Sequence, residues 1–345
     1  MRYVAFTPEL EPTDKIIVDT WDCGRGLHLS HFPGNQTPPE LKADLGVEIA
    51  LRLAVHPWRA EYLGELDVVT NDHFDCDGLL TTFAVLRPEE ARRHRAALID
   101  ASEAGDFYEV SSPRAVEFHH LVDAFLEPDT SPLSRDLKGR STSERNQLCT
   151  DALLAELPGL LYEPERHRRA WEESYRRHLG RLALVSSGRV RVQEYPGERL
   201  SVIHTPEPLD DYGRHYAARG HRLLEVIERA GDRCYVLNYR VAVWYELVSR
   251  STSLMPRLHD LAARLDGLET DRAGRWAITE WNPALRRAHA EPDAAGCAPP
   301  LAPLCPSTIA VDRVVAMLRQ ELHAADETAR SSARRQSGRS LERGS

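Results

Sequence analysis

Apolar and polar positions alternate in blocks along the first third of the chain, and these blocks predict strands and helices in turn. The segments Ile16 to Asp19 and Leu66 to Thr70 are short apolar runs typical of strands. Leu79 to Leu86 is a longer apolar run that ends before Pro88, so it predicts a helix directly after the second strand. A further helix is predicted from Glu89 to Glu103. This order predicts an α/β fold in which helices flank a parallel sheet.

Between the two strands, the sequence predicts a helix with a well-marked beginning. The segment up to Pro39 is rich in Gly, His and Pro and predicts a loop. Thr37 is a favourable N-cap, Pro38 suits the first helical position, and Glu40 completes a capping box. Four apolar residues recur at four-residue spacing and would line one buried face: Leu41, Leu45, Ile49 and Leu53. Pro57 would end this helix.

The length of 345 residues favours two domains. Residues 128–146 are rich in Ser, Pro, Asp and Arg and are the best candidate for a linker. We therefore predict a first α/β domain over residues 1–135 and a smaller, helical and mixed α+β domain over residues 136–325. The Ser-, Arg- and Gly-rich residues 326–345 are predicted to form a disordered tail.

The composition restricts the class of protein. The six cysteines show no CxxC pair and no zinc-finger spacing, so we interpret them as reduced thiols. The segment Met1 to Lys15 carries charge and proline where a secretory signal needs an apolar stretch, and no run of about 18 apolar residues follows. We therefore expect a cytoplasmic protein that does not enter a membrane. The formal net charge of -9 disfavours a general electrostatic grip on nucleic acid.

An acidic turn, residues 71–78 (NDHFDCDG), joins the second predicted strand to its helix. Asp72, Asp75 and Asp77 crowd three carboxylates beside His73, and without a counter-charge they would repel one another. A divalent cation removes this repulsion, and carboxylate oxygens with an imidazole nitrogen suit Mn²⁺, Mg²⁺, Fe²⁺ or Zn²⁺. The carboxyl end of a strand is also where open α/β sheets usually bind ligands. The alternative is a turn of solvated aspartates, which cap helices and tolerate turn geometry.

The turn, with the strand before it and the apolar helix after it, resembles the first motif of the DHH-type phosphoesterases. The resemblance implies a pair of metals, usually manganese, bound at the end of a parallel strand. It makes Asp75 and Asp77 the metal-binding aspartates, with His73 or Asp72 as the neighbouring ligand. Asp106 resembles the isolated aspartate of the second motif, although a helix-ending turn explains it equally well.

Two later motifs of that superfamily are incomplete. The name-giving Asp-His-His is absent, and its nearest match, Phe118-His119-His120, lies in a segment predicted to be helical. Ser249-Arg250-Ser251 resembles part of the substrate-binding domain and makes Arg250 a candidate for binding an anionic substrate. The glycine-rich turn with histidine that should follow is missing. We therefore expect substrate recognition to differ from that of the family's nucleases, or the chain to belong to a separate bacterial family that shares only an ancestor with them.

A second polar constellation occupies residues 28–37 (HLSHFPGNQT). Such a density of polar groups before a predicted helix N-terminus favours binding of an anion over a purely structural role. His28, Ser30 and Asn35 are then candidates for substrate binding. His31 is a candidate second metal ligand or general acid. The alternative is a loop whose polar side chains satisfy one another and cap the helix.

Together these patterns predict a metal-dependent hydrolase, phosphoesterase-like, acting on a small phosphorylated or anionic substrate. His31, Asp72 and His73 are the predicted catalytic residues, and Mn²⁺ is the expected metal. The alternatives are a catalytically silent binding or scaffold protein on the same fold and a non-hydrolytic metal enzyme of small-molecule biosynthesis. Beyond its substrate, the expected partners are few: a short oligonucleotide is compatible with the charge, and a homodimer is compatible with the sequence.

Overall fold

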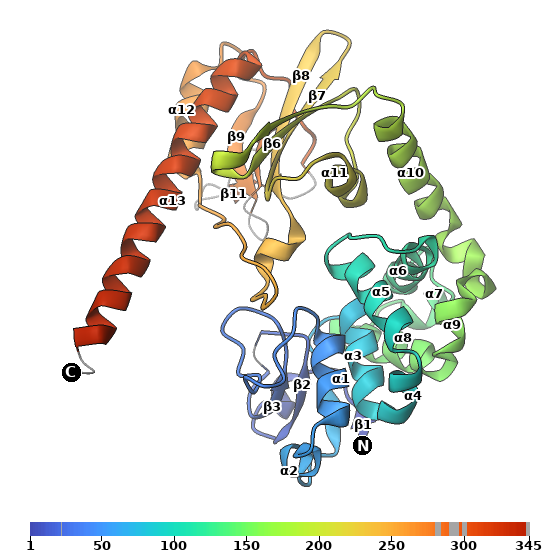
Figure 1. Ribbon diagram of the computed structural model, residues 1–345. Coiled ribbons are helices and arrows are strands. Elements are labelled where there is room, and N and C mark those ends of the chain that lie inside the picture. The colour runs from blue at the N-terminus through green and yellow to red at the C-terminus, as the bar shows by residue number, and fades with distance from the viewer. Residues whose placement is uncertain (22, 280–283, 290–296, 299–301, 343–345) are drawn as a thin grey trace. The chain divides into compact units, whose positions relative to one another are not determined.

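The computed structural model describes the chain except residues 22, 280–283, 290–296, 299–301 and 343–345. The chain forms two compact units (Figure 1), the first made of Met1–Gly180 with Trp244–Ser251 and the second of Arg181–Val243 with Thr252–Ser345. The short segment Trp244–Ser251, which we call the strap, thus packs with the first unit although it is far along the sequence. Residues 136–180, which the sequence assigned to the second domain, also pack with the first unit.

The first unit is built on a four-stranded sheet in the order β1-β4-β2-β3, and all its paired strands are parallel. The bounds are β1 Arg2–Tyr3, β2 Lys15–Val18, β3 Gly26–Leu29 and β4 Val68–Thr70. The predictions of strands at residues 16–19 and 66–70 are confirmed by β2 and β4, whereas β3 lies in a segment predicted to be a loop. Because the strands are parallel, their carboxyl ends meet at one edge of the sheet.

Helices cover this sheet and extend the first unit on one side (Figure 1). Helices α1 and α3 pack against each other and against the strands. The helices of the unit are α1 Gly46–Val55, α2 Arg59–Leu63, α3 Cys76–Leu86, α4 Pro88–Arg93, α5 Arg95–Asp106, α6 Pro113–Leu126, α7 Ser134–Leu137, α8 Thr142–Glu156, α9 Gly159–Tyr162 and the first part of α10 Arg168–Ser186. Helix α3 confirms the helix predicted after the acidic turn.

The predicted start of the first helix is wrong. Helix α1 begins at Gly46. Thr37 does not cap it, since the Thr37 hydroxyl accepts the Ser30 N–H and donates to the Ser30 carbonyl. The N-terminus of α1 is capped instead by Asp77 from α3, whose carboxylate accepts the Gly46 N–H at 2.6 Å and the Val47 N–H at 3.0 Å. The four apolar residues predicted to be buried on this stretch are nevertheless buried.

Two segments predicted to lack regular structure are helical. Residues 128–146, the predicted linker, contain α7 and the beginning of α8, where Ser141 and Glu144 form a capping box. Residues 326–342, in the predicted disordered tail, continue helix α13 Val311–Glu342.

The second unit is built on a seven-stranded mixed sheet in the order β11-β9-β10-β8-β7-β6-β5. Its strands are β5 Arg191–Tyr195, β6 Leu200–Thr205, β7 Arg222–Arg229, β8 Asp232–Tyr239, β9 Arg275–Thr279, β10 Leu285–Ala288 and β11 Cys297–Ala298. Helix α11 Asp211–Ala217 connects the parallel pair β6 and β7, and α12 His259–Leu268 packs on β9 and α13. The predicted α/β fold with a mixed second part is confirmed.

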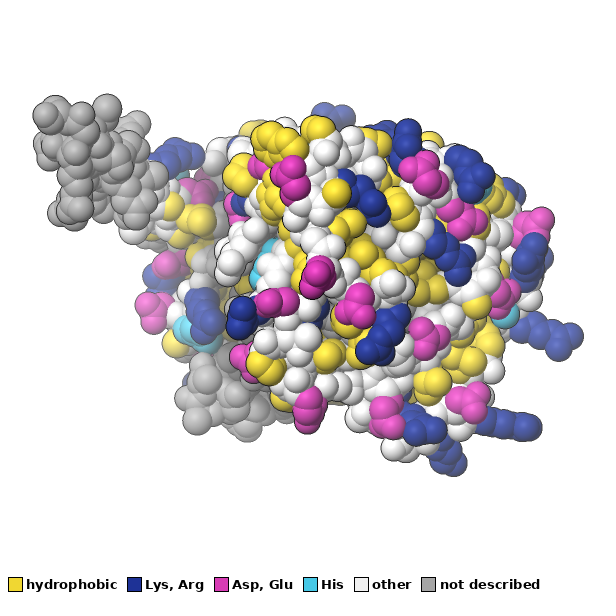
Figure 2. Space-filling model, turned by 90° about the horizontal axis from the view of Figure 1, so that it is seen from below, with side chains coloured by type: hydrophobic (Ala, Val, Ile, Leu, Met, Phe, Trp, Pro, Cys, Tyr) yellow, Lys and Arg dark blue, Asp and Glu magenta, His cyan; other side chains and the backbone are white. Residues whose placement is uncertain are grey.

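Two general features bear on the expected partners. Among the described residues, none of the helices has both the length and the apolar character that crossing a bilayer requires. On the face shown in Figure 2, described basic and acidic side chains are interspersed among apolar ones, so no single sign of charge dominates it.

Candidate metal centre

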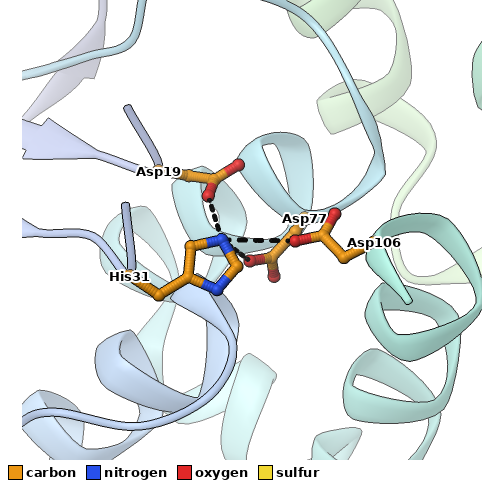
Figure 3. Close-up of side chains that lie close together, drawn as sticks. All are labelled: Asp19, His31, Asp77 and Asp106. Carbon is orange, nitrogen blue, oxygen red and sulfur yellow. Dashed lines mark ion pairs between the residues drawn. The ribbon is translucent and has the colours of Figure 1, made fainter. Parts of the chain in front are cut away.

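The carboxyl edge of the parallel sheet brings together residues from four separate segments. Asp19 directly follows β2, and His31 lies just beyond β3. The acidic turn follows β4 and leads into α3, so that Asp77 lies in the first turn of that helix. Asp106 is the last residue of α5 and reaches the same place. Figure 3 shows the three carboxylates gathered around one ring nitrogen of His31.

The first group of possible metal ligands consists of Asp19, His31, Asp77 and Asp106. The Nε2 atom of His31 lies 3.0 Å from Asp19 Oδ1, 3.3 Å from Asp106 Oδ2 and 3.9 Å from Asp77 Oδ2 (Figure 3). All four residues are buried, with exposed fractions of 4% or less. One ligand atom from each lies within 4.8 Å of the others, a spacing that one cation can bridge.

The second group consists of Asp19, His73 and Asp75. The Nε2 atom of His73 lies 3.2 Å from Asp75 Oδ2 and 3.8 Å from Asp19 Oδ2. Asp19 therefore faces His31 with one carboxylate oxygen and His73 with the other. The side chains of His73 and Asp75 are about one-third exposed (35% and 34%). Solvent therefore reaches the second group, whereas the first group is buried.

Both histidines are oriented through their other ring nitrogen. Nδ1 of His31 donates to the backbone carbonyl of Asp44, which can only accept a hydrogen bond. Nδ1 of His73 lies 2.7 Å from Asp72 Oδ1, and that carboxylate also accepts the hydroxyl of Thr20 at 2.5 Å. Such contacts hold the Nε2 atom of a metal-binding histidine towards the metal. Asp72 therefore lies behind His73 and orients it.

Protonation relieves the crowding of charge in this cluster. Burial and the charge of Asp19 raise the pKa of Asp77 to about 7. Burial and the charge of Asp77 raise the pKa of Asp106 well above its usual range. Burial by itself lowers the pKa of His31, but the nearby carboxylates of Asp106 and Asp19 outweigh burial and raise the pKa well above the usual value. The cluster thus retains protons, which a divalent cation could replace as a counter-charge.

The buried atoms of the first group fit a divalent cation. Within the part of the chain that the structure describes, both carboxylate oxygens of Asp19, Oδ2 of Asp106 and Nε2 of His31 have no partner in hydrogen-bond geometry. Buried polar atoms are normally satisfied, so this convergence calls for a ligand. Carboxylate oxygens with imidazole nitrogens suit Mn²⁺, Mg²⁺, Fe²⁺ and Zn²⁺.

The structure distributes the predicted metal ligands between the two groups. Asp77 and Asp106 belong to the first group and His73 and Asp75 to the second, while His31 belongs to the first. The loop of residues 28–37 and Asp106 thus contribute to one site. Asp19 was not predicted as a ligand, although it is the last residue of the first predicted strand and directly follows the observed β2, just as the acidic turn follows the second strand. Applying the strand-end rule to both strands would have found it.

The residues predicted to bind substrate all contact protein groups. Nε2 of His28 lies 3.4 Å from the Gly24 carbonyl, and the Ser30 hydroxyl donates to the Thr20 carbonyl at 2.7 Å. The Asn35 amide donates to the Phe32 carbonyl at 2.8 Å. These contacts support the loop alternative for His28, Ser30 and Asn35, and their role in substrate binding stays a prediction.

The two remaining motifs lie on different elements. Arg250, in the strap, forms an ion pair with Glu109 at 2.7 Å and lies over the ring of Phe107, so its role in substrate binding also stays a prediction. Phe118, His119 and His120 lie within α6, as the predicted helix requires. Nε2 of His119 is 3.3 Å from Asp123 one turn later.

Comparison with known proteins gives a family and a remote structural likeness. A search of curated proteins found no significant match. Among solved structures, the chain is similar to a pGpG-specific phosphodiesterase, PggH, from Vibrio cholerae, with 14% identity and a TM-score of 0.38 over 90% of this chain and 83% of that one. The sequence model of a family of unknown function, DUF6687, matches residues 1–333, and the chain therefore belongs to that family.

Proposed function

We propose that this protein is a metal-dependent hydrolase that cleaves a phosphate ester or a related small anionic substrate. The observation that carries the proposal is the position of Asp19, whose two oxygens each face a different group of ligating side chains. A carboxylate shared in this way suits a pair of divalent metals. Such metals lower the pKa of bound water and stabilise negative charge on a reacting phosphoryl group.

Two sets of side chains, which share Asp19, would bind these metals. Asp19, His31, Asp77 and Asp106 would hold one metal, and Asp19, His73 and Asp75 the other. The resemblance of the acidic turn to the DHH-type phosphoesterases supports this division and makes Mn²⁺ the first metal to test, with Mg²⁺, Fe²⁺ and Zn²⁺ as alternatives.

The charge of the site makes the metal a precondition for substrate binding. The two groups contain four carboxylates and two histidines, and the nearby Asp72 adds another carboxylate. This surface would repel an anionic substrate, because like charges at short range disfavour association. The partly exposed second group is the side from which a substrate can approach. His73 and Asp75 would therefore lie nearest the reacting group, with Asp72 fixing the orientation of His73.

Metal content followed by a substrate panel tests the proposal. The purified protein should contain Mn²⁺, Fe²⁺ or Zn²⁺, or bind Mn²⁺ after treatment with a chelator, and should hydrolyse one class among phosphomonoesters, phosphodiesters and short oligonucleotides. Asp19→Asn should abolish both properties. Asp14→Asn is the matched control, since Asp14 precedes the same strand but its exposed side chain pairs with Arg25. Absence of metal binding by the parent overturns the proposal, and metal binding without hydrolysis favours a binding protein or a non-hydrolytic enzyme.

A further inference from the structure

The strap lies against the loop that carries His31 and is held there by backbone hydrogen bonds. The Glu246 N–H donates to the His31 carbonyl at 2.8 Å. The Val248 and Ser249 N–H groups donate to the Asp44 carboxylate at 2.7 and 3.0 Å, and the Ser249 hydroxyl donates to the same carboxylate. The strap thus contacts both the metal-ligand candidate His31 and Asp44, which orients it.

Tyr245 is the strap residue that reaches the candidate metal centre. Its ring stacks on the imidazole of His31 with 4.0 Å between centroids and 21° between planes. The phenol ring also makes T-shaped contacts with Phe32 and Phe107, at centroid distances of 5.2 and 5.8 Å. Since ring contacts at these distances restrict rotation of the partner ring, Tyr245 limits the orientations available to the His31 imidazole.

Asp44 joins the two restraints on His31. Its backbone carbonyl accepts the Nδ1–H of His31, and its side-chain carboxylate accepts the hydrogen bonds of the strap. If the strap dissociated from the first unit, Asp44 would lose the hydrogen bonds to its carboxylate, and the His31 imidazole would lose the stacked ring of Tyr245 at the same time. The free strap would leave Nε2 of His31 less firmly directed towards Asp19 and Asp106.

We propose that Tyr245 is a positioning residue for His31, and that docking of the strap completes the first metal-binding group. The inference rests on the proposed metal site but concerns the strap, which contributes no ligand of its own. Groups that orient metal-binding histidines commonly change metal affinity 10- to 100-fold when removed, and we expect an effect of about this size here.

The strap is held mainly by contacts that can break and re-form. Its side-chain ion pairs, Lys42 with Glu246 and Arg250 with Glu109, are partly exposed to solvent. Pairs of this kind each contribute only about 0–1 kcal/mol. Coupling must also be reciprocal: if docking of the strap strengthens metal binding, bound metal must strengthen docking by the same factor.

Titration with Mn²⁺ alone measures how much the docked strap strengthens metal binding. Tyr245→Leu removes the stacked ring and should weaken Mn²⁺ binding about 10- to 100-fold in calorimetry. Tyr245→Phe keeps the ring and should keep the affinity of the parent. Val248→Ala is the matched control on the strap, because the side chain of Val248 is exposed and the variant retains the N–H that bonds to Asp44. Equal affinities for the parent and Tyr245→Leu, or equal losses for Tyr245→Leu and Tyr245→Phe, would overturn the role of stacking.

Hydrogen exchange measures how much bound metal strengthens docking of the strap, and this readout does not depend on catalysis. In the parent, Mn²⁺ should slow exchange of the Glu246, Val248 and Ser249 amides by the factor by which the strap raises affinity. In Tyr245→Leu this slowing should shrink, while circular dichroism should show a folded protein. Unchanged exchange on addition of Mn²⁺ that the parent binds contradicts the inference alone. A parent that binds no Mn²⁺ contradicts the proposed function itself.

Discussion

Asp19 and Asp77 are both buried carboxylates of the first group, yet their surroundings differ. The Asp19 carboxylate accepts no hydrogen bond in the described part of the chain, and Asp19 has a φ of 45°, a conformation that Asn also tolerates. Burial and the charge of Asp75 raise the pKa of Asp19. Asp19→Asn should therefore abolish Mn²⁺-dependent stabilisation, while in chelator the variant should be at least as stable as the parent, because one repelling charge is gone. Thermal unfolding with chelator and with Mn²⁺ checks both statements, and a variant less stable than the parent in chelator would contradict the second.

Asp77→Asn should lose metal binding and also lose stability. Its carboxylate accepts the N–H groups of Gly46 and Val47, and an amide offers only one acceptor oxygen for these two donors. We expect a cost of about 1 kcal/mol in chelator, the usual cost of a lost helix cap. Urea unfolding of parent, Asp77→Asn and Asp19→Asn side by side measures the difference. If the two variants unfold alike, the carboxylate of Asp77 does not act as the cap of α1.

At the residue scale, the sequence predicted side chains that cluster locally and missed those that depend on another segment. Asp75, Asp77 and His73 stand within one turn and were predicted together. Asp19 precedes His73 by 54 residues, and its place beside that turn depends on the pairing of β2 with β4. Thr37 has the sequence context of a cap, but the fold brings it to Ser30 instead, and the cap of α1 comes from α3.

At the scale of elements, Gly46 allows the beginning of α1 to lie close to α3. A Cβ atom at Gly46 would lie 2.7 Å from Thr81 Oγ1 and 2.8 Å from Asp77 Oδ2. Gly46→Ala should therefore displace the Asp77 carboxylate, cost about 1–3 kcal/mol of unfolding free energy and weaken Mn²⁺ binding. Gly267→Ala, within α12, is the control, since its Cβ would meet no atom within 4 Å. There we expect no loss and a gain of up to about 1 kcal/mol. Equal stability of the two variants would show that the approach of α1 to α3 can relax.

Elements whose limits are set locally were predicted well, and those set by distant partners were not. Strand β4 and helix α3 carry their own signals in an apolar run, an Asp N-cap and a following proline. Strand β3 is a half-polar segment that becomes a strand by pairing with β2 along its full length. No pattern within residues 26–29 indicates this pairing.

At the scale of the whole molecule, the boundaries of the units depend on contacts between segments far apart in sequence. The strap returns to the first unit from a position between two stretches of the second. Residues 326–345 have the composition of a disordered tail, yet helix α13 continues through Glu342 and carries Asp326 to Arg222, 104 residues away in sequence. The composition of a segment indicates its average preference for solvent, and it cannot indicate one specific ion pair such as that of Asp326 with Arg222.

That pairing leads to a prediction about the second unit. The guanidinium of Arg222 is fully buried, and Asp326 binds it through two hydrogen bonds of 2.6 and 2.8 Å. Asp326→Ala leaves a buried cation without its counter-ion, which should cost about 3–5 kcal/mol of unfolding free energy at pH 7. Glu327→Ala, one residue later on the same helix, removes only an exposed pair with His323 and should change stability by no more than about 0.5 kcal/mol.

The pH dependence of stability gives an independent check of the same contact. The hydrogen bonds from Arg222 lower the pKa of Asp326 below its unfolded value of about 3.9. The contribution of this carboxylate is therefore fully present above that value and is lost as the pH falls through the lower pKa of the folded state. The difference in unfolding free energy between parent and Asp326→Ala should stay constant from pH 7 to about pH 5 and shrink below about pH 4. Urea unfolding across this range measures it, and a difference that persists unchanged to the lowest pH would mean that Asp326 acts through packing rather than through its charge.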